Sequence, residues 1–318
     1  MNIWKSGIMG VVVGDALGCP VQFESREEVA RHPVTGMRGY GTFNLPAGSW
    51  TDDSSLTLAL VESIRRIGGI DYTDIMDNFV KWLDDGEFTP YSYAFDIERG
   101  TMNAIRKYKC DHKPHKAGSL DESNNGNGSL MRIMPAVLYC CDPPLAAAEA
   151  IDIVHKVGSL THAHIRANIA CGLYYFMASA ILTMDGALTD RLQAGLDKGF
   201  AFYEKYLADH ENLGYYDRLR DLGNFAALPA EKIHGTGYVV DALEAAVWSV
   251  VTTDSFEGAL LRAVNLGDDT DTVGAIAGGL AGLFYGYEAI PEDWLATLQR
   301  REWIEEMVSD INLKNEGQ

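Results

Sequence analysis

The chain has 318 residues, 47% of them hydrophobic, and its 45 acidic against 26 basic side chains give a formal net charge of -19. A surface of this sign repels phosphate backbones and anionic lipids, so we expect neither nucleic acid nor membrane as a partner. The five cysteines are odd in number and form no CxxC pair. This usage is typical of a reducing, cytoplasmic environment without disulfides or zinc.

Helical periodicity dominates the sequence, because apolar residues recur three and four positions apart while alternating apolar and polar runs are nearly absent. Neither an internal repeat nor a low-complexity linker divides the chain. We therefore predict an all-α protein with a single domain over residues 1–318. The expected helices span residues 3–17, 53–67, 72–84, 98–108, 129–140, 144–156, 162–184, 187–208, 238–251, 256–266, 272–285 and 300–311.

The first chemically informative run is Thr51-Asp52-Asp53, which stands at the start of the second expected helix. Asp and Thr are favoured at helix N-caps, so capping alone would explain one of these residues. A cap needs only one side chain, however, and neighbouring carboxylates repel each other unless a cation neutralises them. The run is therefore either a plain helix start or part of a cation site.

The polar stretch over residues 109–127 indicates a functional loop rather than a domain boundary. It continues into a Gly- and Asn-rich segment, residues 123–129, before the helix expected from Ser129. Amides at a helix N-terminus bind anions, and glycines let a phosphate approach the backbone. The segment is a candidate anion site, with a simple turn as the alternative, and it matches neither the Walker A nor the Rossmann motif.

The second acidic run, residues 269–272, directly precedes a helix made of Gly and Ala. Gly274, Gly278 and Gly282 lie four positions apart, so they share one helix face. Such a row lets another backbone approach closely, which offsets the low helix propensity of glycine. The pattern predicts that this helix, with the acidic run at its start, lies deep in the protein.

The two acidic runs together offer more oxygen atoms than two helix caps require. Asp269 and Asp271 would point apart inside a helix, but in the turn before it both can face one centre. Carboxylate and hydroxyl oxygens are the ligands of hard cations such as Mg2+ and Mn2+. An EF-hand loop is absent, and the His pairs 112/115 and 162/164 do not supply a good zinc site. If the fold joins the two runs, they form a two-metal site.

In their order along the chain, these segments resemble the ADP-ribosylglycohydrolases, the family that includes the dinitrogenase reductase-activating glycohydrolase. The resemblance extends from Gly7 to about Leu298, and its specificity comes from the joint presence of its motifs. These motifs are Gly14-Asp15-Ala16-Leu17-Gly18, Trp50-Thr51-Asp52-Asp53, Phe95-Asp96-Ile97, Asn127-Gly128-Ser129-Leu130-Met131-Arg132, Thr161-His162 and Asp269-Thr270-Asp271-Thr272.

The resemblance implies two Mg2+ or Mn2+ ions and cleavage of the bond between the anomeric carbon of ADP-ribose and a protein side chain, often arginine. The expected partner is thus an ADP-ribosylated protein or ADP-ribose, with an ADP-ribosyltransferase as a further candidate. The positions that match the metal ligands of the family are Thr51, Asp52, Asp53, Asp269, Asp271 and Thr272.

The resemblance also assigns roles at the substrate. Asp96 matches a residue with an acid/base or substrate-positioning role, and Asp53 and Asp269 are further candidates for proton transfer. The residues that match the lining of the ribose and diphosphate cleft, or lie near the substrate, are Asn127, Gly128, Ser129, Met131 and His162. Ser129, as the expected helix start, would receive the diphosphate. Tyr238 is a candidate for stacking on adenine, with core packing as its alternative role.

The chain departs from the resemblance at Gln22, where many relatives carry Glu. An amide cannot take a proton from water at neutral pH. The base would then be Asp96, a metal-bound carboxylate, or Glu24, which an extended segment places on the same side. Slow or lost catalysis is the other option, and it leaves two further functions open: an ADP-ribose binder that neutralises an ADP-ribosyltransferase, and a purely structural helical protein.

Overall fold

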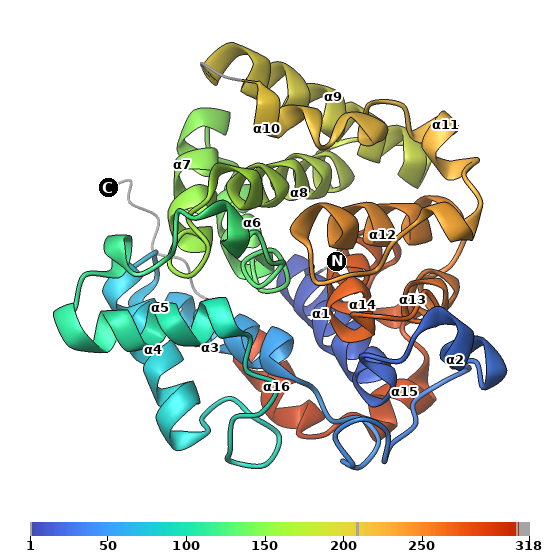
Figure 1. The fold of residues 1–318 in the computed structure, drawn as a ribbon, viewed down its shortest axis with the longest axis horizontal. Helices are drawn as coiled ribbons and strands as arrows, with labels where there is room; N and C mark the ends of the chain where they lie inside the picture. The colour runs from blue at the N-terminus through green and yellow to red at the C-terminus, as the bar shows by residue number, and fades with distance from the viewer. Residues whose placement is uncertain (1, 208–209, 310, 312–318) are drawn as a thin grey trace.

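The computed structural model describes residues 2–207, 210–309 and 311, and in these ranges it contains helices and isolated backbone bridges but no β-strand (Figure 1). The all-α prediction is therefore confirmed. The α-helices are α1 Ile3–Gly18, α2 Arg26–Arg31, α3 Asp52–Ile67, α4 Tyr72–Asp85, α5 Arg99–Asp111, α6 Met134–Cys141, α7 Ala147–Gly158, α8 Ile165–Thr183, α9 Leu188–Tyr206, α10 Glu211–Gly214, α11 Leu222–Ala226, α12 Val239–Val251, α13 Phe256–Val264, α14 Thr270–Tyr285, α15 Glu292–Thr297 and α16 Arg301–Ser309. Residues 208 and 310, which belong to two of the expected helices, lie outside the described residues.

Most expected helices are present, and the differences lie mainly at their starts. The helix expected from Ser129 begins instead at Met134, because residues 129–133 form turns and Pro135 stands in the first helical turn, where a proline is tolerated. α8 begins at Ile165 rather than at 162, after His164 caps it by accepting a hydrogen bond from the Arg166 amide. Helices α2, α10, α11 and α15 were not predicted; with four to six residues each, they are too short to show a period.

Helices α1 and α14 run antiparallel through the middle of the protein with their glycines in contact. A Cβ atom at Gly10 would collide with the carbonyl of Gly278, and one at Gly14 with the carbonyl of Gly274. Nearly every residue of both helices is buried, as expected of helices without a polar face. The close approach predicted for the glycine row of α14 is confirmed, and its partner is a second glycine row in α1.

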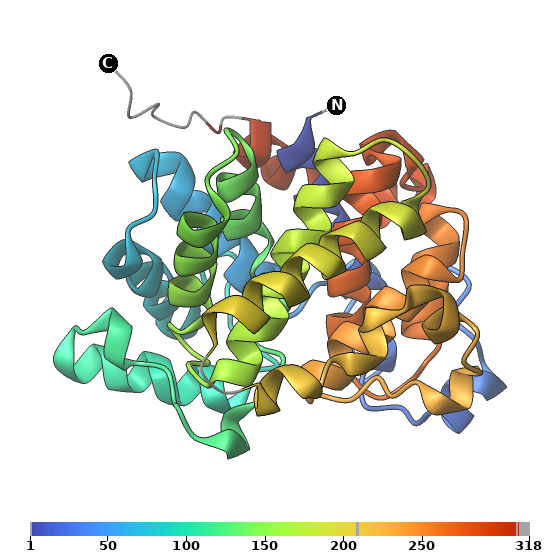
Figure 2. The same cartoon turned by 90° about the horizontal axis from the view of Figure 1, so that it is seen from above.

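The remaining helices surround this pair. α8 and α9 lie side by side, and α8 also contacts α14 (Figures 1 and 2). By length and composition, α8 is the one helix of the described residues that could cross a membrane, but 83% of the apolar stretch is buried inside the fold. It is thus a core helix. On another side, α5 and the turn after it project from the molecule (Figure 2).

The contact between the glycine rows gives a stability prediction. We expect Gly278→Ala to lower the free energy of unfolding by about 2–3 kcal/mol, because the new methyl group pushes α1 and α14 apart. Helix propensity alone would predict the opposite sign, a gain of about 1 kcal/mol. Urea unfolding measures the difference, with Gly69→Ala as the control, since a Cβ at Gly69 meets only the Tyr139 hydroxyl at 3.9 Å. Equal stability of the two variants would contradict the prediction.

Candidate active site

The two acidic runs meet at the last turn of α1. The Asp15 carboxylate accepts hydrogen bonds from the amides of Thr51 at 3.0 Å and Ser54 at 2.9 Å, which ties the start of α3 to α1. The Thr270 hydroxyl donates to the carbonyl of Gly18 at 2.8 Å, which ties the start of α14 to the same turn. One helix end therefore brings together carboxylates that are more than two hundred residues apart in the sequence.

Helix capping does not account for these carboxylates. Asp15, on another helix, accepts the amides at the start of α3, and the N-cap residue Thr51 makes no side-chain capping bond. Asp269 is the N-cap of α14 and likewise makes none. Asp15 fills the capping role at α3, and Asp269 makes no capping bond at α14. Asp52, Asp53 and Asp271 therefore remain available for another purpose.

The acidic side chains are buried and incompletely hydrogen-bonded. Asp52 is 3% exposed, Asp53 1% and Asp271 0%. Asp53 Oδ2 lies 3.3 Å from the Thr51 hydroxyl and 3.4 Å from the Thr272 hydroxyl. The second oxygens of Asp53 and Asp271 are buried without a partner. A buried carboxylate oxygen without a donor is unfavourable, so these atoms call for a ligand.

Burial dominates the electrostatics of the site. It raises the pKa of Asp52, Asp53 and Asp271 well above the usual range, and the neighbouring carboxylates raise it further. Burial also raises the pKa of Asp96 to about 6. In the described part of the chain, no Lys or Arg forms an ion pair with these four side chains. Among the described residues, the protein thus supplies no cationic side chain that would stabilise the ionised form of these carboxylates.

The donor set matches a hard divalent cation in type, since it consists of carboxylate and hydroxyl oxygens with no thiolate. Among residues 2–207, 210–309 and 311, however, no three Asp, Glu, His or Cys side chains are close enough to form a closed ligand group. The residues therefore suit a divalent cation by their oxygen donors, their burial and their unpartnered oxygens, and not by a preformed ligand geometry.

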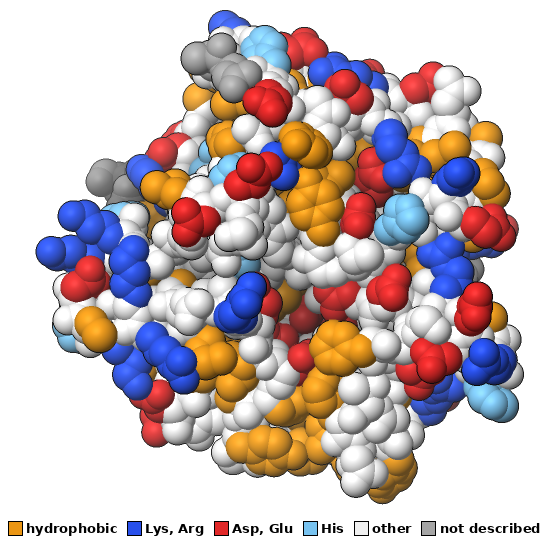
Figure 3. All heavy atoms as spheres, viewed as in Figure 1, with side chains coloured by type: hydrophobic (Ala, Val, Ile, Leu, Met, Phe, Trp, Pro, Cys, Tyr) orange, Lys and Arg blue, Asp and Glu red, His pale blue; other side chains and the backbone are white. Residues whose placement is uncertain are grey.

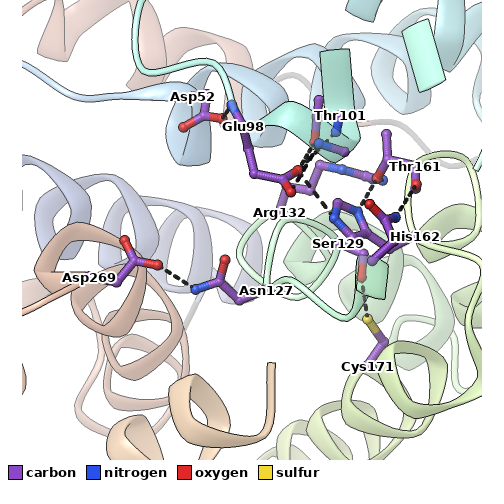
Figure 4. A network of polar contacts seen from close by, with 12 residues as sticks. Asp52, Glu98, Thr101, Asn127, Ser129, Arg132, Thr161, His162, Cys171 and Asp269 are labelled. Carbon is purple, nitrogen blue, oxygen red and sulfur yellow. Dashed lines mark hydrogen bonds and ion pairs between the residues drawn. The ribbon is translucent and has the colours of Figure 1, made fainter. Parts of the chain in front are cut away.

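A cavity of about 570 Å³ opens over the acidic cluster, and Figure 3 shows acidic side chains in a hollow near the centre of this face. Of the residues predicted from the sequence, Asp52, Asp96, Asp269, Thr272, Asn127 and Met131 line this cavity. Asp53 and Asp271 lie under it and contact the lining residue Thr272, and Thr51 in turn contacts Asp53. Asn127 donates to Asp269 at 2.6 Å, which joins the predicted substrate loop to the acidic cluster (Figure 4).

Three residues predicted to contact the substrate lie behind the cavity wall. His162 is fully buried, with Nε2 3.2 Å from Glu98 Oε2 and Nδ1 2.8 Å from the Thr161 hydroxyl (Figure 4). Gly128 lies against this pair, and a Cβ there would stand 2.8 Å from both side chains. Ser129 is buried and accepts a bond from Cys171. The structure therefore places these residues in the support of the site, while Glu98 faces the cavity.

Two expectations about this region need correction. The helix end at Ser129 that was expected to receive a diphosphate does not exist, because α6 starts at Met134 and residues 129–133 form turns. Glu24, considered as a base, is absent from the cavity lining, where Phe23 follows Gln22. Tyr238 is half-buried at the start of α12, and its hydroxyl accepts a bond from Arg166 at 3.1 Å.

Gln22 lies inside the acidic site. Its amide nitrogen donates to Asp269 at 3.4 Å, and its contact with Asp96 lowers the pKa of that carboxyl against the larger effect of burial. The amide oxygen of Gln22 is buried without a partner. Gln22 therefore supplies a hydrogen-bond donor between two carboxylates, a role that a glutamate could not fill while ionised.

Sequence reasoning missed two functional residues. Asp15 organises the start of α3, but as part of the motif Gly14-Asp15-Ala16-Leu17-Gly18 it received no role of its own. Glu98 N-caps α5, and its backbone amide donates to Asp52 at 3.4 Å. Burial by itself would raise the pKa of Glu98. The His162 imidazole and the hydrogen bonds from Thr101 outweigh burial and lower this pKa to about 2. The position of Glu98 two residues after Asp96, at a helix start, was the available signal.

Several known proteins are similar to this chain in sequence or in structure. The sequence profile of the ADP-ribosylglycohydrolase family matches residues 4–318. The ADP-ribosylarginine hydrolase Tri1 of Serratia proteamaculans (strain 568) is 30% identical over 310 residues, which cover 96% of this chain and 78% of that protein. The ADP-ribosyl-(dinitrogen reductase) glycohydrolase of Rhodospirillum rubrum is 30% identical over 295 residues, covering 92% of this chain and 89% of that protein. A solved ADP-ribosylglycohydrolase-related protein complex is similar with a TM-score of 0.78 and 32% identity, covering 98% of this chain and 97% of that one. The chain therefore belongs to the ADP-ribosylglycohydrolase family of enzymes.

Proposed function

We propose that this enzyme removes ADP-ribose from arginine side chains of modified proteins and that it requires two divalent cations, Mg2+ or Mn2+. The observation that carries the proposal is the pair of buried, unpartnered carboxylate oxygens of Asp53 and Asp271 beneath the cavity. The relative named as an ADP-ribosylarginine hydrolase supports arginine as the linked residue. The residues that would hold the cations are Thr51, Asp52, Asp53, Asp269, Asp271 and Thr272.

When bound, the cations would neutralise the carboxylates and act as Lewis acids toward the ribose hydroxyls and water. The other tasks belong to the chain. Asn127 and Met131 line the cavity beside Asp269, so they would orient the sugar. As the arginine leaves, positive charge develops at the anomeric carbon. The carboxylates of Asp52 and Asp269 at the cavity would stabilise this charge.

Asp96 is the residue best placed to move the proton. It lines the cavity, one of its carboxylate oxygens is buried without a partner, and its backbone is held at a φ of 51°. Water would add its oxygen to the anomeric carbon while the bond to the arginine nitrogen breaks. One proton of this water would pass to Asp96 and from there to the leaving arginine nitrogen. Asp53 and Asp269 are the alternatives for this step.

A hydrolysis panel tests the proposed function. ADP-ribose linked to arginine, to serine and to an acetyl oxygen is offered to the protein with Mg2+, with Mn2+ and with a chelator. We expect release of ADP-ribose from the arginine linkage, dependent on a divalent cation. Turnover in chelator would reject the cation requirement, and a preference for another linkage would reject arginine.

The alternative function is a binder of ADP-ribose that neutralises an ADP-ribosyltransferase. Gln22 is the feature that favours it, because an amide replaces a proton acceptor in the acidic site. Calorimetry with ADP-ribose separates the two functions when combined with the hydrolysis panel. Binding without turnover under either cation would support the binder.

A further inference from the structure

A second cavity, of about 860 Å³, opens next to the active-site cavity. Arg99, the first residue of α5, lies in the walls of both. The second cavity is bordered by one face of α5, with Asn103 and Lys107, and by the turn that carries His115 and Lys116. A group that projects from the active-site cavity past Arg99 therefore enters the second cavity.

The surface around this second cavity is basic in an otherwise acidic protein. Six Lys or Arg residues and one acidic residue lie between positions 99 and 116, although the whole chain has a net charge of -19. Lys and Arg side chains gather over α5 and the turn after it, at the left of Figure 3. Lys109 pairs with Asp84 at 2.5 Å, whereas no ion pair within the described residues neutralises Arg99, Lys107 or Lys116. The lining itself contains one acidic side chain, Asp121.

The spacing of two cations and the polar Asn103 between them suits an extended peptide. Arg99, Asn103 and Lys107 stand at intervals of four residues on the exposed face of α5, and such residues are about 6 Å apart along a helix. Alternate side chains of an extended chain are about 6.6 Å apart. Leu120, at the cavity, is 76% exposed, so it offers a bound peptide an apolar contact.

We propose that this second cavity binds an acidic segment of the target protein, next to the ADP-ribosylated residue, while the ADP-ribose occupies the active-site cavity. The proposal rests on the proposed function for the identity of the modified group. Carboxylates of the target would pair with Arg99, Lys107 and Lys116, and an apolar side chain would cover Leu120. The cavity would thereby select targets whose modified residue has acidic neighbours.

The test compares substrates that share the same scissile bond. Wild type and the Lys107→Glu/Lys116→Glu variant are assayed on ADP-ribosyl-arginine, on an ADP-ribosylated peptide with acidic flanks and on one with neutral flanks. Lys198→Glu/Lys205→Glu is the matched control, since both lysines are exposed on α9. We expect kcat/KM of the variant to fall about tenfold on the acidic peptide through KM. It should be unchanged on ADP-ribosyl-arginine, and the control should match wild type.

Two further measurements keep the docking proposal separate from the proposed function. Fluorescence anisotropy with the unmodified acidic peptide reports docking even where no substrate is hydrolysed, and we expect binding that weakens with salt and is lost in the variant. Failure of wild type on ADP-ribosyl-arginine would reject the proposed function alone. Equal affinity of wild type and variant for the acidic peptide would overturn the docking site. Weaker binding of free ADP-ribose by the variant would also overturn the docking site, because it would make the cavity part of the nucleotide site. Tighter binding of an oligonucleotide than of the peptide would overturn it as well.

Discussion

Replacing Asp271 with asparagine should lower the hydrolysis of ADP-ribosyl-arginine about 10³-fold without unfolding the protein. Asparagine keeps the oxygen that accepts the Thr272 amide at 2.9 Å. It removes a negative charge whose second oxygen is buried without a partner. Because this charge is destabilising on its own, the thermal midpoint in chelator should stay equal or rise. Opposite changes in activity and stability are the signature of a residue kept for function.

The control for this prediction lies three residues earlier on the same turn. Asp268 is exposed, has a φ of 65° and uses its backbone to pair with Phe23 and Glu24. Asparagine tolerates this backbone conformation, so Asp268→Asn should retain activity. Cation binding by titration calorimetry completes the comparison, and Asp271→Asn should weaken it. Full activity of Asp271→Asn would remove this residue from the metal site.

Replacing Asp15 with alanine should cost about 3–5 kcal/mol of stability and most of the activity. The Asp15 carboxylate accepts bonds from the amides and hydroxyls of both Thr51 and Ser54. Alanine leaves these donors buried at the start of α3, so the backbone that carries Asp52 and Asp53 should shift. Urea unfolding and the hydrolysis assay measure the two effects.

A conventional helix cap provides the comparison for Asp15. Asp71 caps α4 by accepting the amides of Thr73 and Asp74, and it is exposed. Asp71→Ala should therefore cost only about 1 kcal/mol and leave the activity unchanged. Asp15→Asn, which keeps one acceptor oxygen, should lie between the two alanine variants in stability. If Asp15→Ala retains full activity, the position of the acidic cluster does not depend on this contact.

The fold and the site are predictable from the sequence on different grounds. The helical period and the glycine row of α14 are local patterns, so they predict helices and a close helix contact without knowledge of the partner. Local signals fail where they compete: Gly126, Gly128 and Ser129 favour a turn before a helix, and Pro135 then sets the true start of α6. The residue types of the acidic runs likewise indicated their chemistry, since two caps do not need so many oxygens.

By itself, the sequence determined that the protein is helical, that a glycine-rich helix lies at its centre and that two acidic runs are candidates for one site. Only the tertiary structure decided that both runs meet at the last turn of α1, that Asp15 takes over the capping and that His162 supports Glu98 from behind the cavity wall. The physical reason is the distance along the chain over which each signal acts. Periodicity and composition act within one or two helical turns, whereas these contacts join residues 36, 252 and 64 positions apart, and only the packing of α1 against α3 and α14 brings the acidic runs together.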